Sequence, residues 1–448
     1  MLNKAKKLIL GSFGKKQNKD VKEVLIGALI AFSVKICAVG VNFGHNVVIA
    51  NYLGPADTGK FFLALSVTSI AVIFAKFGTD VSILRYLSPE AANGNWGKVK
   101  GIYLTANQLT IIIAIGITAV TFFGAGQIST YFFSKPELEP YLKLFSLGIL
   151  PIALTYNATE TFRSLKKIRY AMSLRGIYLP FFAILGTVFL AKSIGLSGAI
   201  IGYIGGALII SIAAFFQWRK FLRDKKDPVV AASMNSFFHK SRPFFWQSFF
   251  QQSIIWGSTI ILGIWVSDSE LGNYEIAKRI ARLTSFFLIA FTSILAPKLG
   301  ELYAKNDIES INLVCKKTTL FMTVFSIPAF ILLYLFPEFF LSFFGKGFGG
   351  EATLVLQIIL IGQFVNIAFG PVEFTLNMCG REKIMRNIVA ASALVIVVSS
   401  LILIPLYGVI GGAIAFSLSL IFKNFASAFW LKKELNIITI PFMSTLIK

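Results

Sequence analysis

The chain has 448 residues, of which 56% are hydrophobic and only 14% are charged. A soluble protein carries about 25% charged residues, so this composition excludes an ordinary soluble domain. The net charge of +22 does not indicate nucleic-acid binding, because the basic residues gather in short segments between apolar runs, a pattern typical of membrane topology.

Twelve apolar runs follow one another along the chain, each close to the roughly 20 residues that a helix needs to cross a bilayer. Backbone groups in lipid must be hydrogen-bonded within their own segment, so we predict that the runs are helices. Turn-forming clusters such as Leu53-Gly54-Pro55 and Pro405-Leu406-Tyr407-Gly408 separate them. The predicted spans are 24–49, 58–84, 101–123, 139–162, 173–191, 197–218, 244–266, 273–297, 313–336, 351–376, 387–404 and 409–430.

The basic residues predict the orientation of these spans. The connecting segments on the side of the N-terminus hold 32 Lys or Arg, and the segments on the opposite side hold 5. The positive-inside rule therefore places both termini in the cytoplasm. The predicted fold class is an all-α polytopic membrane protein.

The chain also aligns with itself at an offset of 213 residues. Gly195-Leu196-Ser197-Gly198 lies over Gly408-Val409-Ile410-Gly411, and Arg219-Lys220 lies over Lys432-Lys433. We therefore predict twelve transmembrane helices in two six-helix parallel repeats around a central cavity, a common transporter design. The predicted domains are a basic cytoplasmic lead (1–23), an N-terminal bundle (24–218), a solvated cytoplasmic linker (219–243), a C-terminal bundle (244–430) and a cytoplasmic tail (431–448).

Function is sought among polar groups inside the spans, because an ionisable group in the bilayer is costly. In the first span, spacings of seven and four place Lys35, Asn42 and Asn46 on one helical face, with His45 adjacent. One interpretation is a polar stripe that faces a water-filled cavity and contacts substrate. The alternative is hydrogen bonding between helices.

Three acids have two possible roles. In the second span, Lys76 and Asp80 are four residues apart and can form an ion pair. Alternatively, Asp80 takes up a proton and couples transport to protons. Glu160 and Glu373 are further candidates for coupling or for ion pairing.

The eighth span begins with the cations Lys278, Arg279 and Arg282, which outnumber the neighbouring Glu275. The surplus positive charge lies near the predicted extracytoplasmic side, where topology does not explain it. Guanidinium groups match phosphate oxygens, so the cluster is typical of anion recognition. The alternative is an interfacial helix end whose long side chains reach water.

Amide side chains are the other candidates for cavity lining. Asn157, Gln251 and Asn366 lie within predicted spans, where they suit a hydroxylated cargo such as a sugar or, equally, packing between helices. The segment Gly345-Lys346-Gly347 resembles a nucleotide loop but lacks the Ser or Thr that follows Lys, so we interpret it as a turn. The sequence predicts no metal site, no cofactor, no catalytic residue and no enzymatic activity.

Three segments carry a resemblance to a known family: Ile49–Phe61, Phe77–Tyr86, and Phe343–Phe348 followed by Ala352 and Leu356. The chain resembles the polysaccharide or O-antigen flippases of the multidrug/oligosaccharidyl-lipid/polysaccharide exporter superfamily. The resemblance implies alternating access in a bacterial inner membrane. The implied cargo is an undecaprenyl-diphosphate-linked oligosaccharide that moves from the cytoplasmic to the periplasmic leaflet. The implied partners are this substrate, membrane lipid and other polysaccharide-assembly proteins, and the family's basic residues correspond in position to Lys35, Lys76 and Arg279 or Arg282.

Two alternative functions stay open. A multidrug exporter of the same fold would use intramembrane acids to attract organic cations. In the predicted spans of this chain, however, six bases outnumber four acids. A membrane glycan polymerase would need a long extracytoplasmic loop, and no predicted outer loop exceeds about 20 residues by the span boundaries given above.

Overall fold

A computed structural model describes residues 15–440, apart from the side chains of 15–32, 287, 289, 290, 293, 294, 296 and 297. Parts of the predicted lead (1–23) and tail (431–448) therefore lie outside the described residues. Residues 15–440 form helices and loops, and no strand. In chain order these are α2 (Lys15–Lys76), α3 (Thr79–Ala92), α4 (Trp96–Phe123), α5 (Ala125–Gln127), the π-helix η1 (Ile128–Phe132), the 3-10 helix η2 (Pro136–Leu138), α6 (Glu139–Ser146), α7 (Ile149–Ser164), α8 (Ile168–Ser173), the π-helix η3 (Leu174–Tyr178), α9 (Leu179–Leu222), α10 (Met234–Trp265), α11 (Asp268–Arg282), the 3-10 helix η4 (Leu283–Ser285), α12 (Phe286–Ala304), α13 (Ile308–Leu335), α14 (Pro337–Ser342), α15 (Glu351–Ala368), α16 (Val372–Met378) and α17 (Glu382–Leu435).

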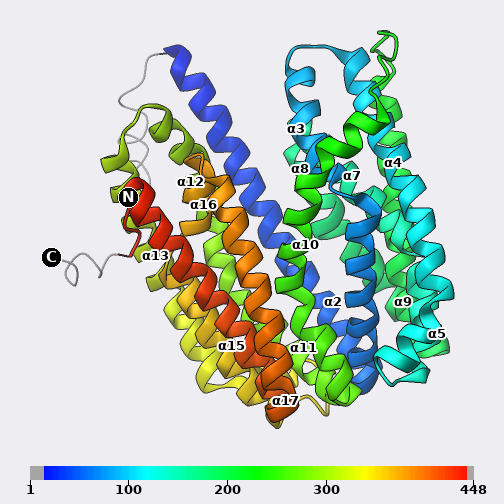
Figure 1. Cartoon of the computed structure of the whole chain (residues 1–448). Helices are drawn as coiled ribbons and strands as arrows, with labels where there is room; N and C mark the ends of the chain where they lie inside the picture. The colour runs from blue at the N-terminus through cyan, green and yellow to red at the C-terminus, as the bar shows by residue number, and fades with distance from the viewer. Residues whose placement is uncertain (1–14, 441–448) are drawn as a thin grey trace.

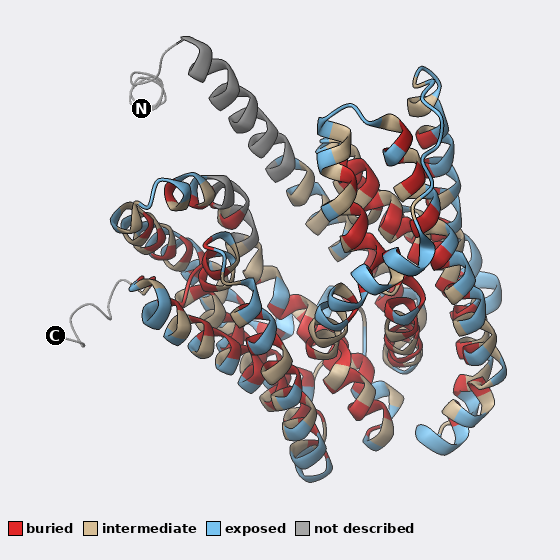
Figure 2. Cartoon of the chain, turned by 45° about the horizontal axis from the view of Figure 1, so that its top comes forward, coloured by how far each residue is buried: buried red, intermediate tan, exposed pale blue. Residues whose placement is uncertain are grey.

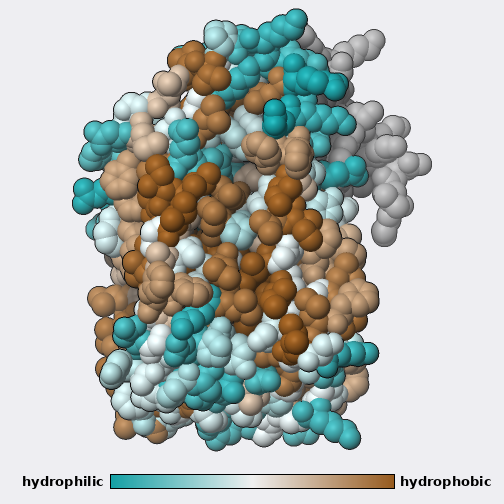
Figure 3. Space-filling model, turned by 90° about the vertical axis from the view of Figure 1, so that its right-hand side faces the viewer, coloured by the Kyte–Doolittle hydropathy of each residue, from teal (hydrophilic) through white to brown (hydrophobic). Residues whose placement is uncertain are grey.

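The length and composition of the helices fit a polytopic membrane protein. In the described chain, six helical segments are long and apolar enough to cross a membrane, or seven if the bent pair α6–α7 is one span. Three of the six have 44, 55 and 54 residues, more than twice what one crossing needs. Hydrophobic atoms cover the middle of the face in Figure 3, and hydrophilic atoms gather toward its two ends. The count of twelve spans stays a prediction.

The three longest helical segments contain breaks at glycines in predicted turns. Gly54 interrupts α2 with a φ of 71°, Gly195 interrupts α9 with φ 56° and ψ −136°, and Gly408 interrupts α17 with φ 54° and ψ −132°. Positive φ is strained for residues that have a Cβ, which explains the glycines. Gly195 and Gly408 are 213 positions apart and share nearly the same backbone geometry.

The helices form two groups with the central helices between them (Figure 1). Helices α3 to α9 lie on one side and α12 to α17 on the other, while α10 and α11 run near α2 in the middle. Helix α2 begins and α17 ends toward the upper side of that view. Buried residues gather where the helices face one another, and exposed residues cover the outside of each group (Figure 2).

The two groups touch backbone to backbone where α2 crosses α11, a contact we call the glycine crossing. A Cβ atom built on Gly59 would lie 1.9 Å from the carbonyl oxygen of Asp268, and one built on Gly272 would lie 2.0 Å from that of Pro55. Beside it, Lys135 Nζ lies 2.7 Å from an Asp268 carboxylate oxygen. Gly59 and Gly272 are themselves 213 positions apart, so two positions that the self-alignment pairs meet each other here.

The linker between the halves is exposed to solvent but is hydrogen-bonded to α4. Residues 223–233 are not helical apart from a turn. The Val230 amide donates to the Gly97 carbonyl oxygen at 3.0 Å, and Thr105 Oγ1 donates to that of Ala232 at 3.1 Å. Lys100 Nζ donates to the Asp227 carbonyl oxygen at 2.8 Å. The predicted solvated linker thus runs along the start of α4 and is held by the N-terminal half.

We predict that Gly272→Ala destabilises the protein by about 1–3 kcal/mol, the usual effect of overpacking. The added methyl group would overlap the Pro55 carbonyl oxygen, so the two helices must separate. Thermal unfolding of the purified protein measures the effect. Gly205→Ala in α9 is the matched control, because a Cβ there meets no atom within 4 Å. Equal unfolding midpoints for the two variants would contradict the prediction.

Candidate functional site

Helix α11 carries the most deeply buried group of charges, which we call the Arg279 cluster: Glu275, Lys278 and Arg279. A capping box of Ser267 and Glu270 fixes the start of the helix. Spacings of three and four then place the three charged side chains on one helical face. That face is turned toward α10 and α2, so the charges lie inside the protein.

One carboxylate holds both cations of the Arg279 cluster. The Glu275 side chain is fully buried, pairs with Lys278 Nζ, and lies 3.3 Å from Arg279 Nη2. Thr259 Oγ1 on α10 donates to Glu275 at 2.5 Å. Arg279 Nε has no hydrogen-bond partner among the described residues. The cluster therefore holds one surplus positive charge, and Arg279 has an unused donor.

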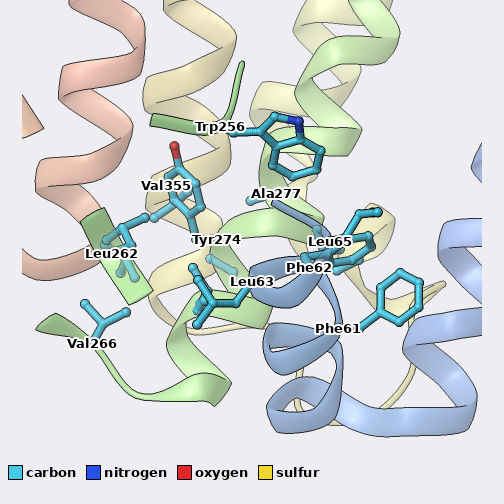
Figure 4. Close-up of a cluster of buried hydrophobic side chains, with 14 of the residues drawn as sticks. Phe61, Phe62, Leu63, Leu65, Trp256, Leu262, Val266, Tyr274, Ala277 and Val355 are labelled. Atoms are coloured by element: carbon cyan, nitrogen blue, oxygen red, sulfur yellow. The ribbon is translucent and has the colours of Figure 1, made fainter. Parts of the chain in front are cut away.

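Aromatic rings surround the surplus charge. Arg279 Cζ lies 3.7 Å from the centroid of the Phe62 ring on α2 and 5.8 Å from that of Trp256 on α10. Lys278 Nζ lies 5.0 Å from the Tyr274 ring. Figure 4 shows Phe62 and Trp256 in the same buried cluster as Tyr274 and Ala277 of α11. Arg279 therefore joins the two halves through a cation–π contact.

A second group of charges lies in the N-terminal half. Lys76 pairs with Asp80, and both side chains are buried. Arg163 Nη1 lies 3.1 Å from Glu160. Arg175 Cζ lies 3.3 Å from the centroid of the Tyr156 ring, which Lys76 Nζ also approaches at 4.5 Å.

The polar residues of the first span are partly used in helix contacts. Asn42 donates to the Gly176 carbonyl oxygen at 2.9 Å and so ties α2 to η3, and Asn46 donates to the carbonyl oxygen of Asn42. His45 is buried, stacks on Tyr203 at 6.1 Å between centroids, and has no partner for Nε2 in the described chain. Lys35 is half-buried.

The remaining candidates are dispersed. Asn157 is fully buried and bonded to Thr79 and Thr110 at 2.9 Å each, which favours the packing interpretation of this amide. In the C-terminal half, Lys423 pairs with Glu373 at 3.0 Å and Asn424 bonds to Asn366 at 2.9 Å. Gln251 is half-buried, and Arg282 is exposed. The candidates thus form several polar groups and not one site.

Three residues at these places were not among the sequence-based candidates: Arg175, Tyr203 and Phe62. Arg175 falls inside the predicted span 173–191, which is the signal that could have identified it. Nothing in the sequence shows that Phe62 faces Arg279 or that Tyr203 faces His45, because these contacts join distant segments.

Comparisons with known proteins agree on the family and the fold. A family model described as polysaccharide biosynthesis protein matches residues 24–303, and one described as MatE matches residues 243–403. The probable low-salt glycan biosynthesis flippase Agl15 of Haloferax volcanii is 24% identical over 416 residues, which cover 91% of this chain and 83% of that protein. Stage V sporulation protein B of Bacillus subtilis is 22% identical and covers 45% of this chain and 40% of that protein.

Two solved structures share the fold. The lipid II flippase MurJ, in an inward closed conformation, superposes with a TM-score of 0.73 at 17% identity, covering 91% of this chain and 87% of that chain. An inward-facing multidrug resistance MATE family transporter of the MOP superfamily superposes with a TM-score of 0.75 at 12% identity, covering 91% and 98%. At these identities the likeness shows the fold alone.

We predict that Glu275→Gln destabilises the protein by about 3–5 kcal/mol, because it leaves buried Lys278 without a countercharge. Adding Lys278→Met should restore part of the loss, since it removes the unpaired charge. The measurement is the fraction of monodisperse protein after heating.

The matched control is Glu301→Gln. Glu301 also contacts two lysines, at 3.1 and 2.7 Å, but it is 44% exposed. Exposed pairs contribute about 0–1 kcal/mol, so this variant should behave like the parent. A Glu275→Gln protein as heat-resistant as the control would contradict the prediction.

Proposed function

The chain belongs to the polysaccharide biosynthesis protein family, as its sequence motifs predicted, and we propose that it is a flippase for a lipid-linked oligosaccharide. It is a transport protein and not an enzyme. The names of its relatives and the fold support this class of cargo. The observation that carries the proposal is the surplus positive charge of the Arg279 cluster, buried at the contact between the two halves.

The chemistry of the cluster suits the head of such a cargo. A lipid-linked oligosaccharide has an anionic phosphate or diphosphate between its glycan and its lipid. Arg279 has an unpartnered Nε and a side chain that is 14% exposed, so it can turn part of its guanidinium to a phosphate without losing Glu275. Charge-assisted bonds of this kind are about twice as strong as neutral ones.

We propose the following finer description of the cargo and its path. The cargo is an undecaprenyl-diphosphate-linked repeat unit of a surface polysaccharide such as O-antigen. It moves from the cytoplasmic to the periplasmic leaflet of a bacterial inner membrane, with both protein termini in the cytoplasm. Lys35, His45 and Lys76 would line the cationic path on the side of the N-terminal half, with Asn42, Asn46 and Gln251 as polar lining.

The proposed movement is a rotation of two six-helix bundles, 24–218 and 244–430, that are parallel repeats. The glycine crossing holds these bundles together at one end of the molecule, and Asn51 Nδ2 donates there to the Phe343 carbonyl oxygen at 2.9 Å. Release of cargo past this contact requires the bundles to separate there. The Phe62–Arg279 contact would part in the same step.

A multidrug exporter is the second candidate, favoured by the MatE match over residues 243–403. The ion pairs argue against it, since each buried carboxylate named above is already paired with a cation. An organic cation would therefore meet neutral or positive surroundings.

We predict that Arg279→Gln abolishes export of the glycan while the protein still reaches the membrane. The variant removes the surplus charge but keeps a polar side chain of similar length. In cells, the lipid-linked oligosaccharide should then accumulate in the cytoplasmic leaflet, and surface polysaccharide should fall at least about tenfold, as expected for a loss of 1.4 kcal/mol or more in cargo binding.

Arg223→Gln, at an exposed position of the linker (78% exposed), is the control and should export normally. Normal surface polysaccharide in Arg279→Gln would refute the role of this residue. Accumulation of single repeat units in the outer leaflet on deletion would indicate a polymerase instead, and drug sensitivity with normal polysaccharide would indicate an exporter.

A further inference from the structure

A small, partly open cavity lies within the N-terminal half, among α2, α7, η3 and α9. Its volume is about 40 Å³, and one buried water needs roughly 10–15 Å³ on the same measure. The cavity can therefore hold a few waters or one compact ion. Six of its lining residues are polar: Thr68, Ser69, Thr155, Tyr156, Arg175 and Tyr203.

Arg175 brings a positive charge to this cavity without a matching acid. The other cations nearby are paired, Lys76 with Asp80 and Arg163 with Glu160. In the described part of the chain, Arg175 forms no ion pair or side-chain hydrogen bond and contacts the Tyr156 ring face. Glu160 also lies within electrostatic range of Arg175 but is paired with Arg163, so Arg175 is a surplus cation at this cavity.

The rest of the lining supplies donors and no acid. Thr68 and Thr155 donate to carbonyl oxygens of their own helices. Among the described side chains, the hydroxyls of Ser69, Tyr156 and Tyr203 form no hydrogen bond. The other four lining residues are leucine, isoleucine or valine. A site that has a guanidinium and hydroxyl donors but no carboxylate can bind an anion. It lacks the ligands for a metal ion and the acid for a proton.

The backbone at Arg175 is also unusual. Arg175 lies in η3, a π-helix over Leu174–Tyr178, between the ordinary helices α8 and α9. Single-turn π segments inside helices are frequent at functional sites. The residue 213 positions later is Ile388, within the regular helix α17. Neither the charge nor the π-helix is a feature of the shared repeat.

We propose that this cavity is an anion site in which Arg175 binds one compact anion, a halide or a single phosphate-sized group. Arg279 does not line the cavity, although Tyr203 lies within electrostatic range of both arginines, so the proposed anion contact is with Arg175. The proposal does not rest on the identity of the cargo, because binding of a free anion can be measured on the purified protein alone.

The test is thermal unfolding of the full chain in lipid nanodiscs, with sodium chloride or sodium phosphate replacing sodium gluconate at constant ionic strength. Gluconate is too large for the cavity and serves as the reference. A saturating rise of about 2 °C or more in the unfolding midpoint is expected for the parent protein with at least one of the two anions. The chloride and phosphate arms decide which anion the site takes.

Arg175→Gln should lose the rise, whereas Arg169→Gln, at an exposed arginine six residues earlier, should keep it. Ser69→Ala should weaken the anion affinity without loss of folding and serves if Arg175→Gln does not fold. Bromide, located by anomalous scattering in crystals of the parent protein, should lie beside Arg175. No anion-specific rise in the parent, or an equal rise in Arg175→Gln or Ser69→Ala, would overturn the proposal.

Discussion

The arrangement of the central helices depends on one buried carboxylate that must hold two cations. Glu275 is fully buried and is shared by Lys278 and Arg279. An ion inside a membrane protein is tolerated only when it is paired or faces a water-filled space. Glu275 satisfies this condition for Lys278, because the two form an ion pair. Lys278 also donates a hydrogen bond to Thr259. Arg279 keeps part of its hydrogen-bonding capacity, so it is the group through which the buried cluster can respond to an arriving anion.

In the proposed flippase, the position of that charge would link cargo binding to movement. Arg279 stacks on Phe62, one turn from the glycine crossing at which the backbones of α2 and α11 touch. A phosphate that draws Arg279 away from the ring would weaken the same contact that must part for release. Binding can shift an equilibrium between two arrangements only through such a difference in contacts. In the proposed mechanism, the cluster would couple cargo binding to opening in this way.

The sequence predicted the features that depend on local chemistry. It located the breaks at Gly54 and Gly408 from turn composition. It also offered ion pairing as one of two roles for Lys76 and Asp80, which pair across the break between α2 and α3 that the sequence did not predict. It did not predict that η3 is a π-helix that places Arg175 at a cavity, or that the linker is fixed along α4. These features depend on contacts with backbone carbonyls and aromatic rings of distant segments. Hydrophobic periodicity does not predict such contacts. For Asn157, the structure favours packing over cavity lining, because its amide is hydrogen-bonded between helices.

In the proposed repeat, corresponding positions of α2 and α11 carry different side chains, and the charges of the Arg279 cluster lie on α11 alone. Gly59 and Gly272, which are 213 residues apart, meet at the crossing. In the proposed repeat, the residues around one glycine therefore correspond in position to the residues around the other. Phe62 is the counterpart of Glu275, and Ser66, whose hydroxyl donates within its own helix, is the counterpart of Arg279. One copy therefore supplies the cation and the other supplies the ring on which it stacks. If both copies of the proposed repeat carried the cation, like charges would lie opposite each other, which is destabilising in a medium of low polarity, so the difference at these positions lets Arg279 meet a ring instead.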